Sequence, residues 1–223
     1  MIFFKKQHNA FLYSALILLS TAGFFALGRS LRALQPLKEL FHAGEYARKT
    51  LIRDNKIKKV LFSPDNPVKK TLLGLIQEEQ ESIRIAAFSL TDIDIAAALI
   101  KAHEQGILVE IVVDGQQSRS TYSKVPVLFK RGIPIFSYEP LAGSKETKEW
   151  TSLMHNKFII FGKSLLNKAV LWTGSFNFTR TASLHNQENV IIDDDQEVSC
   201  AYMNHFEVLK RRCHRVSSPS AYA

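Results

Sequence analysis

Hydrophobic residues recur in short runs separated by polar segments, and from about residue 60 these runs predict alternating strands and helices. Two nearly continuous apolar runs, 83–90 and 108–113, are typical of strands that are buried on both faces. Between them, residues 91–94 resemble a helix capping box, and Gly106 ends the helical pattern. Strands that alternate with helices predict a layered α/β domain whose central sheet is mostly parallel and is flanked by helices.

The rest of this region continues the same alternation. The patterns predict further strands at 60–63, 133–138, 153–161, 169–173 and 190–192, and further helices at 67–80, 125–131 and 196–212. The last helix has an apolar stripe made of Val198, Tyr202, Phe206 and Leu209, which predicts that this face packs on the sheet.

The N-terminal region has a different pattern. Residues 9–28 carry no charge and have basic residues on both sides, and their number matches the roughly 20 residues that a membrane-spanning helix needs. This length favours a retained single-pass N-terminal anchor, which would place the protein at a membrane. The small residues of Ala26-Leu27-Gly28 instead suit signal peptidase, which would leave a periplasmic or secreted protein. A buried helix of a soluble domain is the third interpretation.

Three segments are therefore expected. Residues 1–30 form the hydrophobic anchor or signal peptide, residues 31–59 a basic stem, and residues 60–215 the folded domain.

Composition narrows the class of protein. The 223 residues are 46% hydrophobic and 22% charged, which is ordinary for a globular chain, and the two cysteines exclude a disulfide-stapled mini-domain or a cysteine-rich zinc module. The 29 Lys and Arg against 21 Asp and Glu give a net charge of +8. This excess favours polyanionic partners such as nucleic acid or anionic lipid head groups.

Candidate chemistry is concentrated in the last third of the chain. In the predicted strand 153–161, alternation places His155 and Lys157 on one side, where an ammonium can neutralise phosphate oxygens and an imidazole can attack phosphorus or move a proton. After the next strand, Ser175 and Asn177 offer hydroxyl and carboxamide groups to an anion, although helix capping is an alternative reading. Glu188 opens another strand and could hold a histidine ring in one tautomer, although a surface role is the simpler reading.

These pieces together resemble the phospholipase D superfamily. The resemblance rests on the order His155-x-Lys157, Gly174-Ser175-x-Asn177 and Glu188-Asn189, and on residues 86–114, which look like the strand–helix–strand unit that opens that domain. It extends over residues 60–212 and is strongest to short members with one His-x-Lys motif. These are the bacterial periplasmic endonuclease type and the mitochondrial cardiolipin hydrolase type.

One position departs from the family pattern. In that pattern four residues follow His-x-Lys and an Asp comes next, and here that next position is Gly162. The aspartate is regarded as a support of the site's architecture, so its absence puts local stability in question and raises the alternative of a degenerate protein.

The resemblance implies a mechanism and an assembly. Because the family works with two motifs and this chain has one, it implies a homodimer in which one His155 forms a phosphohistidine and the partner's His155 acts as acid and then base. It also implies that Lys157, Asn177 and Ser175 bind the phosphate oxygens, that Glu188 orients a histidine, and that no metal or other cofactor takes part.

The substrate is left open. We expect a metal-independent phosphodiesterase, first of all an endonuclease acting on DNA or RNA, because of the basic charge. The alternatives are a phospholipase D or cardiolipin-type hydrolase held at the membrane by its N-terminal helix, and a membrane-tethered protein that binds phosphate without turnover.

Overall fold

The structure, a computed structural model, describes residues 42–139 and 152–217. Apart from His42, these residues belong to one compact unit, Ala43–Ala223. The anchor or signal segment predicted for residues 1–30 lies outside the described residues and stays a prediction. Among the helices that are described, none combines the length and the apolar character needed to cross a membrane.

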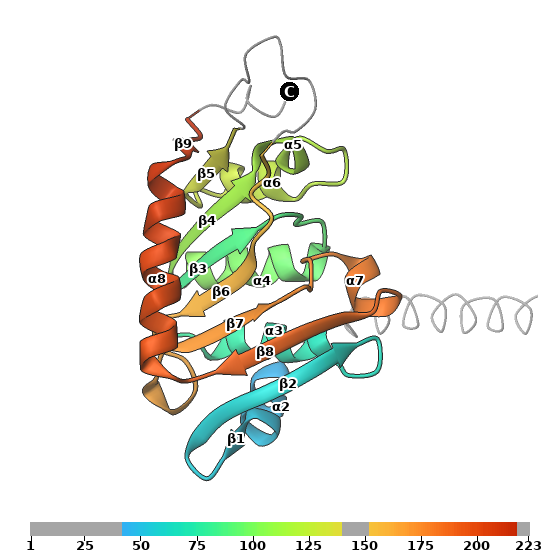
Figure 1. The fold of residues 1–223 in the computed structure, drawn as a ribbon, viewed down its shortest axis with the longest axis vertical. Helices are drawn as coiled ribbons and strands as arrows, with labels where there is room; N and C mark the ends of the chain where they lie inside the picture. The colour runs from blue at the N-terminus through green and yellow to red at the C-terminus, as the bar shows by residue number, and fades with distance from the viewer. Residues whose placement is uncertain (1–41, 140–151, 218–223) are drawn as a thin grey trace, which may run out of the picture. The chain divides into compact units, whose positions relative to one another are not determined.

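A mixed sheet forms the centre of the unit (Figure 1). In the described residues it has nine strands in the order β1-β2-β8-β7-β6-β3-β4-β5-β9. Their bounds, in that order, are Ile52–Arg53, Lys56–Ser63, Glu188–Asp193, Val170–Gly174, Lys157–Phe161, Ser82–Ala87, Leu108–Asp114, Ile135–Tyr138 and His214–Arg215.

The α/β class is confirmed, but the prediction of a mostly parallel sheet is wrong. In the described residues only β3–β4 and β4–β5 are parallel, and every other neighbouring pair is antiparallel. Parallel neighbours need a long crossover, which α4 (Ile93–Glu104) supplies for the first pair and α5 (Gly115–Ser118) with α6 (Val125–Lys130) for the second. A short link containing only the 3₁₀ turn η1 (Leu165–Asn167) joins β6 to β7, so these strands run in opposite directions.

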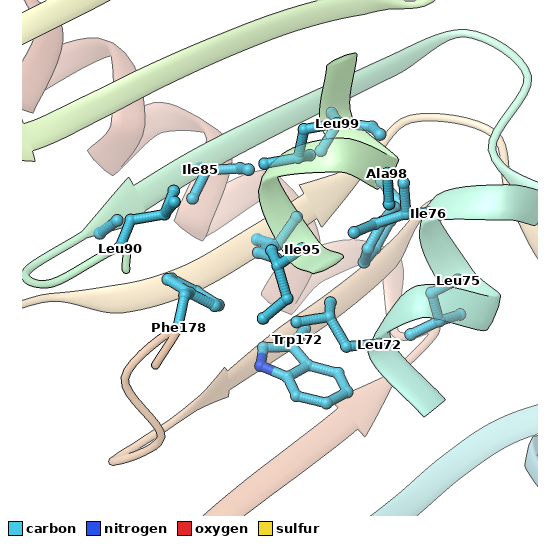
Figure 2. Close-up of a cluster of buried hydrophobic side chains, with 14 of the residues drawn as sticks. Leu72, Leu75, Ile76, Ile85, Leu90, Ile95, Ala98, Leu99, Trp172 and Phe178 are labelled. Atoms are coloured by element: carbon cyan, nitrogen blue, oxygen red, sulfur yellow. The ribbon is translucent and has the colours of Figure 1, made fainter. Parts of the chain in front are cut away.

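Helices cover the two faces of this sheet unequally. The helices α2 (Ala43–Leu51), α3 (Val68–Glu78) and α4 lie behind the sheet in Figure 1, and α8 (Gln196–Arg211) crosses in front of it. Figure 2 shows part of the core between sheet and helices, in which Trp172 of β7 is fully buried near Leu72 of α3 and Ile95 of α4. Burial of each such side chain contributes about 1.5–3 kcal/mol, so this face holds the strands firmly in place.

On the other face, α8 packs on the middle of the sheet. Its Phe206 and Leu209 are buried against sheet residues that include Phe158 of β6. The stripe predicted for this helix is thus confirmed at its C-terminal half, whereas Val198 at its start is 40% exposed. Lys210 Nζ also donates to Glu110 Oε1 of β4 at 2.6 Å, which ties the helix end to the sheet.

Two predicted boundaries differ in the structure. Part of the segment expected as a stem, residues 31–59, forms α2, β1 and the start of β2 inside the compact unit. In α2, Ala43 and Ala47 are buried, and they approach α3 so closely at Gly74 that no side chain fits there. The strand expected from residue 153 begins at Lys157 instead, so His155 lies in the segment that leads into β6.

The far end of β6 is held by a carboxylate from another element. Glu79, only 6% exposed, accepts hydrogen bonds at Oε1 from the backbone N–H groups of Glu81, Ser82 and Lys163, at 2.8, 2.8 and 2.9 Å. Gly162 N donates to Ser82 O at 2.8 Å, and a Cβ at position 162 would collide with Ser82 Oγ. The chain therefore ties this end through Glu79 and leaves no room for a side chain where the resembled family has Asp.

This packing predicts a coupled effect of two substitutions. Gly162→Ala should lower the free energy of unfolding by about 1–3 kcal/mol, because the added methyl meets the buried Ser82 hydroxyl. In a Ser82→Ala background the loss should be much smaller, since the remaining neighbours of that Cβ lie at 3.4 and 3.5 Å. Urea unfolding of the four proteins of this cycle measures the coupling. An equal loss in both backgrounds would contradict the packing described here.

Candidate active site

Four neighbouring strands bring the predicted site residues to one edge of the sheet. The register pairs Ala87 with Lys157, Phe158 with Thr173, and Gly174 with Val190, so β3 and β7 end where β6 and β8 begin. The segments that carry the candidates therefore meet at this edge. The candidates are His155, Lys157, Ser175, Asn177 and Glu188.

The lysine and the histidine of the motif are in direct contact. Lys157 Nζ donates to the backbone carbonyl of His155 at 2.6 Å, and the imidazole itself is exposed. The Lys157 side chain is buried, with the residue only 7% exposed. The ring is therefore accessible to a ligand, while the ammonium of the largely buried Lys157 is held at the carbonyl of His155.

Burial and a nearby carboxylate both affect the pKa of Lys157. Desolvation lowers the pKa of its ammonium, and the negative charge of Glu188 acts in the opposite direction. Among the described residues Lys157 forms no ion pair, so its charge is only partly compensated. An anion bound at this edge would supply the missing partner.

Glu188 and Ser175 form a second cluster beside this pair. Ser175 Oγ donates to Glu188 Oε2 at 2.6 Å, and Asn186 Nδ2 donates to Glu188 Oε1 at 3.0 Å. Ser175 N donates to Asn189 Oδ1, and Asn189 N donates to Ser175 Oγ, both at 3.0 Å, and these two bonds close the cluster. Within the described residues of one chain Glu188 does not hydrogen-bond His155, so its predicted role of orienting a histidine ring stays a prediction.

Asn177 is presented by a loop with two buried aromatic anchors. Phe176 and Phe178 are 1% and 0% exposed, and they alternate with Ser175, Asn177 and Thr179. The Oδ1 atom of Asn177 is buried without a hydrogen-bond partner in the described chain. A buried acceptor of this kind is costly unless a donor satisfies it. The Nδ2 group of the same carboxamide is the donor that an anionic ligand would need.

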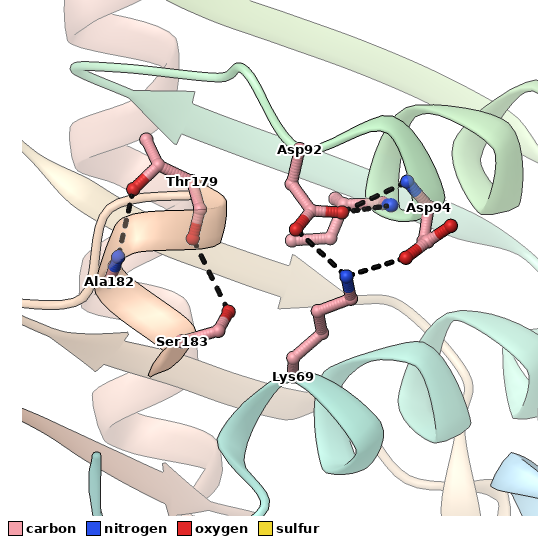
Figure 3. Close-up of polar contacts among 7 residues, drawn as sticks. Lys69, Asp92, Asp94, Thr179, Ala182 and Ser183 are labelled. Atoms are coloured by element: carbon pink, nitrogen blue, oxygen red, sulfur yellow. Dashed lines mark hydrogen bonds and ion pairs between the residues drawn. The ribbon is translucent and has the colours of Figure 1, made fainter. Parts of the chain in front are cut away.

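A network of polar contacts holds this loop in place, and Figure 3 draws two parts of it, one around Thr179 and one around Lys69. Thr179 caps α7 (Arg180–Leu184) by accepting from Ala182 N at 3.1 Å. The N–H groups of Thr91 and Asp92 both donate to the Phe178 carbonyl at 3.0 Å, and the Asp92 carboxylate accepts from Lys69 Nζ of α3 at 2.9 Å. Burial lowers the pKa of Lys69, but its hydrogen bonds to Asp94 and Asp92 outweigh that effect and the pKa is raised. The network fixes the loop on the ends of α3 and α4.

Two residues that the sequence reasoning missed support the motif. Asp114, at the end of β4, is 1% exposed and accepts from Met154 N at 3.2 Å, directly before His155. Phe88, after β3, contacts the ring of His155 and the ammonium of Lys157. An Asp that ends a buried strand is a usable signal, but nothing in the sequence separates Phe88 from the core residues around it.

Metal ligands do not gather in the described parts of the chain. Across residues 42–139 and 152–217, no three His, Cys, Asp or Glu side chains lie close enough to hold an ion together. The groups at this edge are a cation, an imidazole, a carboxamide, a hydroxyl and the carboxylate of Glu188. The first four can bind an anionic ligand with several oxygen atoms, and the carboxylate can pair with a cationic group of the site.

Comparisons with known proteins identify the family of this chain. The family model described as "Cardiolipin synthase, PLD-like domain" matches residues 72–210, more than half of the chain. The phospholipase D of Rickettsia conorii is 33% identical over 145 residues, which are 65% of each protein. The mitochondrial cardiolipin hydrolase of Xenopus tropicalis is 27% identical over 138 residues, 62% of this chain and 59% of that protein.

Comparison with solved structures points to the same family. The structure of Nuc from Salmonella typhimurium, a phospholipase D family member, matches with a TM-score of 0.62 and 26% identity, over 73% of this chain and 99% of that one. The chain thus spans somewhat less than two thirds of the first curated relative and nearly all of a solved one. From the matched family model, the related sequences and the shared fold, we conclude that this chain belongs to the phospholipase D superfamily.

Proposed function

We propose that the protein is a phosphodiesterase that works through a phosphohistidine on His155 and is active as a homodimer. The observation that carries this proposal is the largely buried side chain of Lys157 next to the exposed imidazole of His155. Its ammonium contacts the His155 carbonyl and lacks an ion-pair partner among the described residues. A phosphodiester brings the negative charge that this position lacks, and it places phosphorus beside a nucleophilic ring.

The first step transfers the phosphoryl group to the enzyme. The lone pair of an imidazole nitrogen of His155 forms a bond to phosphorus, and the bond from phosphorus to the leaving oxygen breaks. The partner's His155 donates a proton to that oxygen. Lys157 and the Nδ2 group of Asn177 bind the non-bridging oxygens. The Ser175 hydroxyl, which donates to Glu188 in the free chain, turns to add a hydrogen bond.

The second step regenerates the enzyme. The partner's His155, now neutral, takes a proton from water, and the resulting hydroxide attacks phosphorus while the bond to His155 breaks. Glu188 orients a histidine ring and stabilises its charge during this cycle. The cations of the protein take the part that a divalent ion has in many other phosphodiesterases, so we propose that no metal is required.

Nucleic acid is the first substrate that we propose. The net charge of +8 favours a polyanion, and the resemblance to short endonuclease members points the same way. In this proposal, a nucleic-acid strand lies along the edge of the sheet where the site residues meet.

A phospholipid is the second candidate, and specific observations favour it. Two matched relatives are named phospholipase D and mitochondrial cardiolipin hydrolase. Large apolar side chains are also exposed on loops and helix ends at the site's edge of the sheet, among them Ile93 at 68%, Tyr122 at 78% and Leu184 at 50%. We propose that residues 9–28 hold the protein at a membrane, or direct its export if they are cleaved.

The proposed chemistry predicts turnover that resists chelation. With the full chain in excess EDTA, single-stranded DNA, RNA and cardiolipin vesicles are offered separately, and at least one should be cleaved. His155→Ala should abolish that cleavage, because both steps need the ring, whereas His103→Ala on α4 should leave it unchanged.

The arms of this experiment separate the alternatives. The polymer or lipid that is cleaved identifies the substrate class. Cleavage that needs added magnesium would refute the metal-free mechanism, and binding without any cleavage would favour the degenerate, phosphate-binding protein.

The homodimer has a candidate contact surface beside the site. Val60 and Phe62 of β2 and Ile191 of β8 are exposed by 49, 54 and 45%. They lie on adjacent strands, with Val60 opposite Ile191 and Phe62 opposite Asn189, one residue from Glu188. Helix α8 covers β7 on this face, where Tyr202 contacts Thr173 at 3.2 Å, but leaves these side chains bare. We propose that a second copy covers them and brings the partner's His155 to the site.

Phe62→Glu should therefore convert the protein to a monomer and strongly reduce turnover, because a carboxylate in an apolar contact is costly to bury. Sedimentation velocity and the activity assay measure the two effects together. Leu108→Glu is the matched control. Leu108 is 46% exposed and pairs with Ser82 at the start of β3, at the ends of the strands away from the site. This substitution should change neither the oligomeric state nor the activity. A monomeric Phe62→Glu protein with full activity would contradict the shared site.

A further inference from the structure

Phe88 contacts both chemical groups of the His155-x-Lys157 motif. Its ring centroid lies 4.4 Å from that of His155 with the planes tilted by 60°, and Lys157 Nζ lies over the ring, 4.7 Å from its centroid. The backbone N–H of Phe88 also donates to the carbonyl of Asn156 at 3.0 Å. One residue therefore holds the motif at three consecutive positions.

The contact accounts for the direction of the Lys157 side chain. An ammonium has three donors, and one of them is used by the His155 carbonyl at 2.6 Å. The face of an aromatic ring attracts a cation and fixes it on a second side. The ammonium is thereby held between a carbonyl and a ring, and its remaining donor capacity is left for a ligand.

Core packing does not explain an aromatic residue at this position. Phe88 is only half-buried and belongs to neither of the two hydrophobic clusters of the described chain. Its neighbours Ala87 and Leu90 supply the buried side chains of this segment. Its ring instead contacts the side chains of His155 and Lys157.

The ring also matches the charge that the reaction creates. When an imidazole nitrogen of neutral His155 bonds to phosphorus, the ring becomes cationic, and the electrons of the broken bond leave with the oxygen that the partner's His155 protonates. A neighbouring π-face stabilises a cation and does so more strongly where water is excluded. Phe88 thus contacts the ammonium of Lys157, which is already cationic, and the ring of His155, which becomes cationic in the reaction.

We propose that Phe88 is a positioning residue that sets the spacing of the His155 ring and the Lys157 ammonium and stabilises the cationic phosphohistidine. This role rests on the proposed function. It gives the His155-x-Lys157 motif a fixed aromatic partner from the residue that follows β3, the strand paired with β6.

The test compares variants that keep or lose the ring. Phe88→Leu keeps an apolar side chain without a π-face and should lower kcat about tenfold with KM changed by no more than about twofold. Phe88→Tyr keeps the ring and should stay within about threefold of the wild type. Phe88→Met is a second ring-free variant in case the leucine protein does not fold. Phe136→Leu is the matched control, because Phe136 lies under Lys210, 4.9 Å away and outside the site.

A second readout does not depend on turnover. NMR titration of the Lys157 side chain measures its pKa, which burial lowers and the charge of Glu188 raises. Loss of the ring removes a stabiliser of the ammonium while an apolar cover remains, so the pKa should fall further in Phe88→Leu and not in Phe88→Tyr or Phe136→Leu. The exposed imidazole of His155 and the carboxylate of Glu188 are the titratable neighbours, and both are present in all variants.

The outcomes separate this role from the proposed function. Unchanged kcat and unchanged Lys157 pKa in Phe88→Leu would overturn the role of Phe88, even if His155→Ala is inactive. An equal loss in Phe88→Tyr would overturn it as well, since the ring would then be irrelevant. A wild type that cleaves no phosphodiester would refute the proposed function, and with it the role of Phe88 in catalysis. In that case, a change of the Lys157 pKa confined to the ring-free variants would still show that the Phe88 ring stabilises the Lys157 ammonium.

Discussion

The buried ammonium of Lys157 is the constraint on which the rest of the site depends. Removing a charge from water costs several kcal/mol even after relaxation, and a buried charge normally has an ion-pair partner. Here, in the described chain, the ammonium has a backbone carbonyl and an aromatic face in contact, with the carboxylate of Glu188 acting through its charge. Its lowered pKa expresses this deficit. The site is therefore prepared for an anion before any ligand arrives.

The fold holds this unfavourable arrangement by fixing the motif segment at both ends. At one end the buried carboxylate of Asp114 accepts from Met154 N, and at the other the buried carboxylate of Glu79 accepts from Lys163 N. Between them, β6 is paired on both sides, with β3 and β7. Strain or charge at a site persists only where the surroundings fix it from several directions, and this segment meets that condition.

The sequence predicted most elements and the residues that could do chemistry. Buried strands such as 108–113 are visible as apolar runs, and the spacing of His155 and Lys157 indicates phosphate chemistry. The direction of the strands was not predictable from such runs, because an apolar run has the same pattern in a parallel and an antiparallel pair. The pairing of β2 with β8 joins segments more than a hundred residues apart, which no local pattern reveals.

The residues that support the site could not be predicted from the sequence either, for a different reason. Gly162 suggests a missing carboxylate, but the carboxylate that holds this end of β6 comes from Glu79, which lies far from it along the chain. Phe88 was one apolar residue in an apolar run, and only the register of β3 with β6 places it against the motif. Residues that act through tertiary contacts have no local signature, whereas residues that react have a characteristic chemical type.

The most direct test of the central claim is to trap the covalent intermediate. The active protein is mixed with its substrate, quenched in base during turnover, where a phosphohistidine survives, and digested for mass spectrometry. The account predicts that the peptide containing His155 carries the retained half of the phosphodiester. Rapid turnover with no adduct on His155, or with an adduct on another residue, would contradict it.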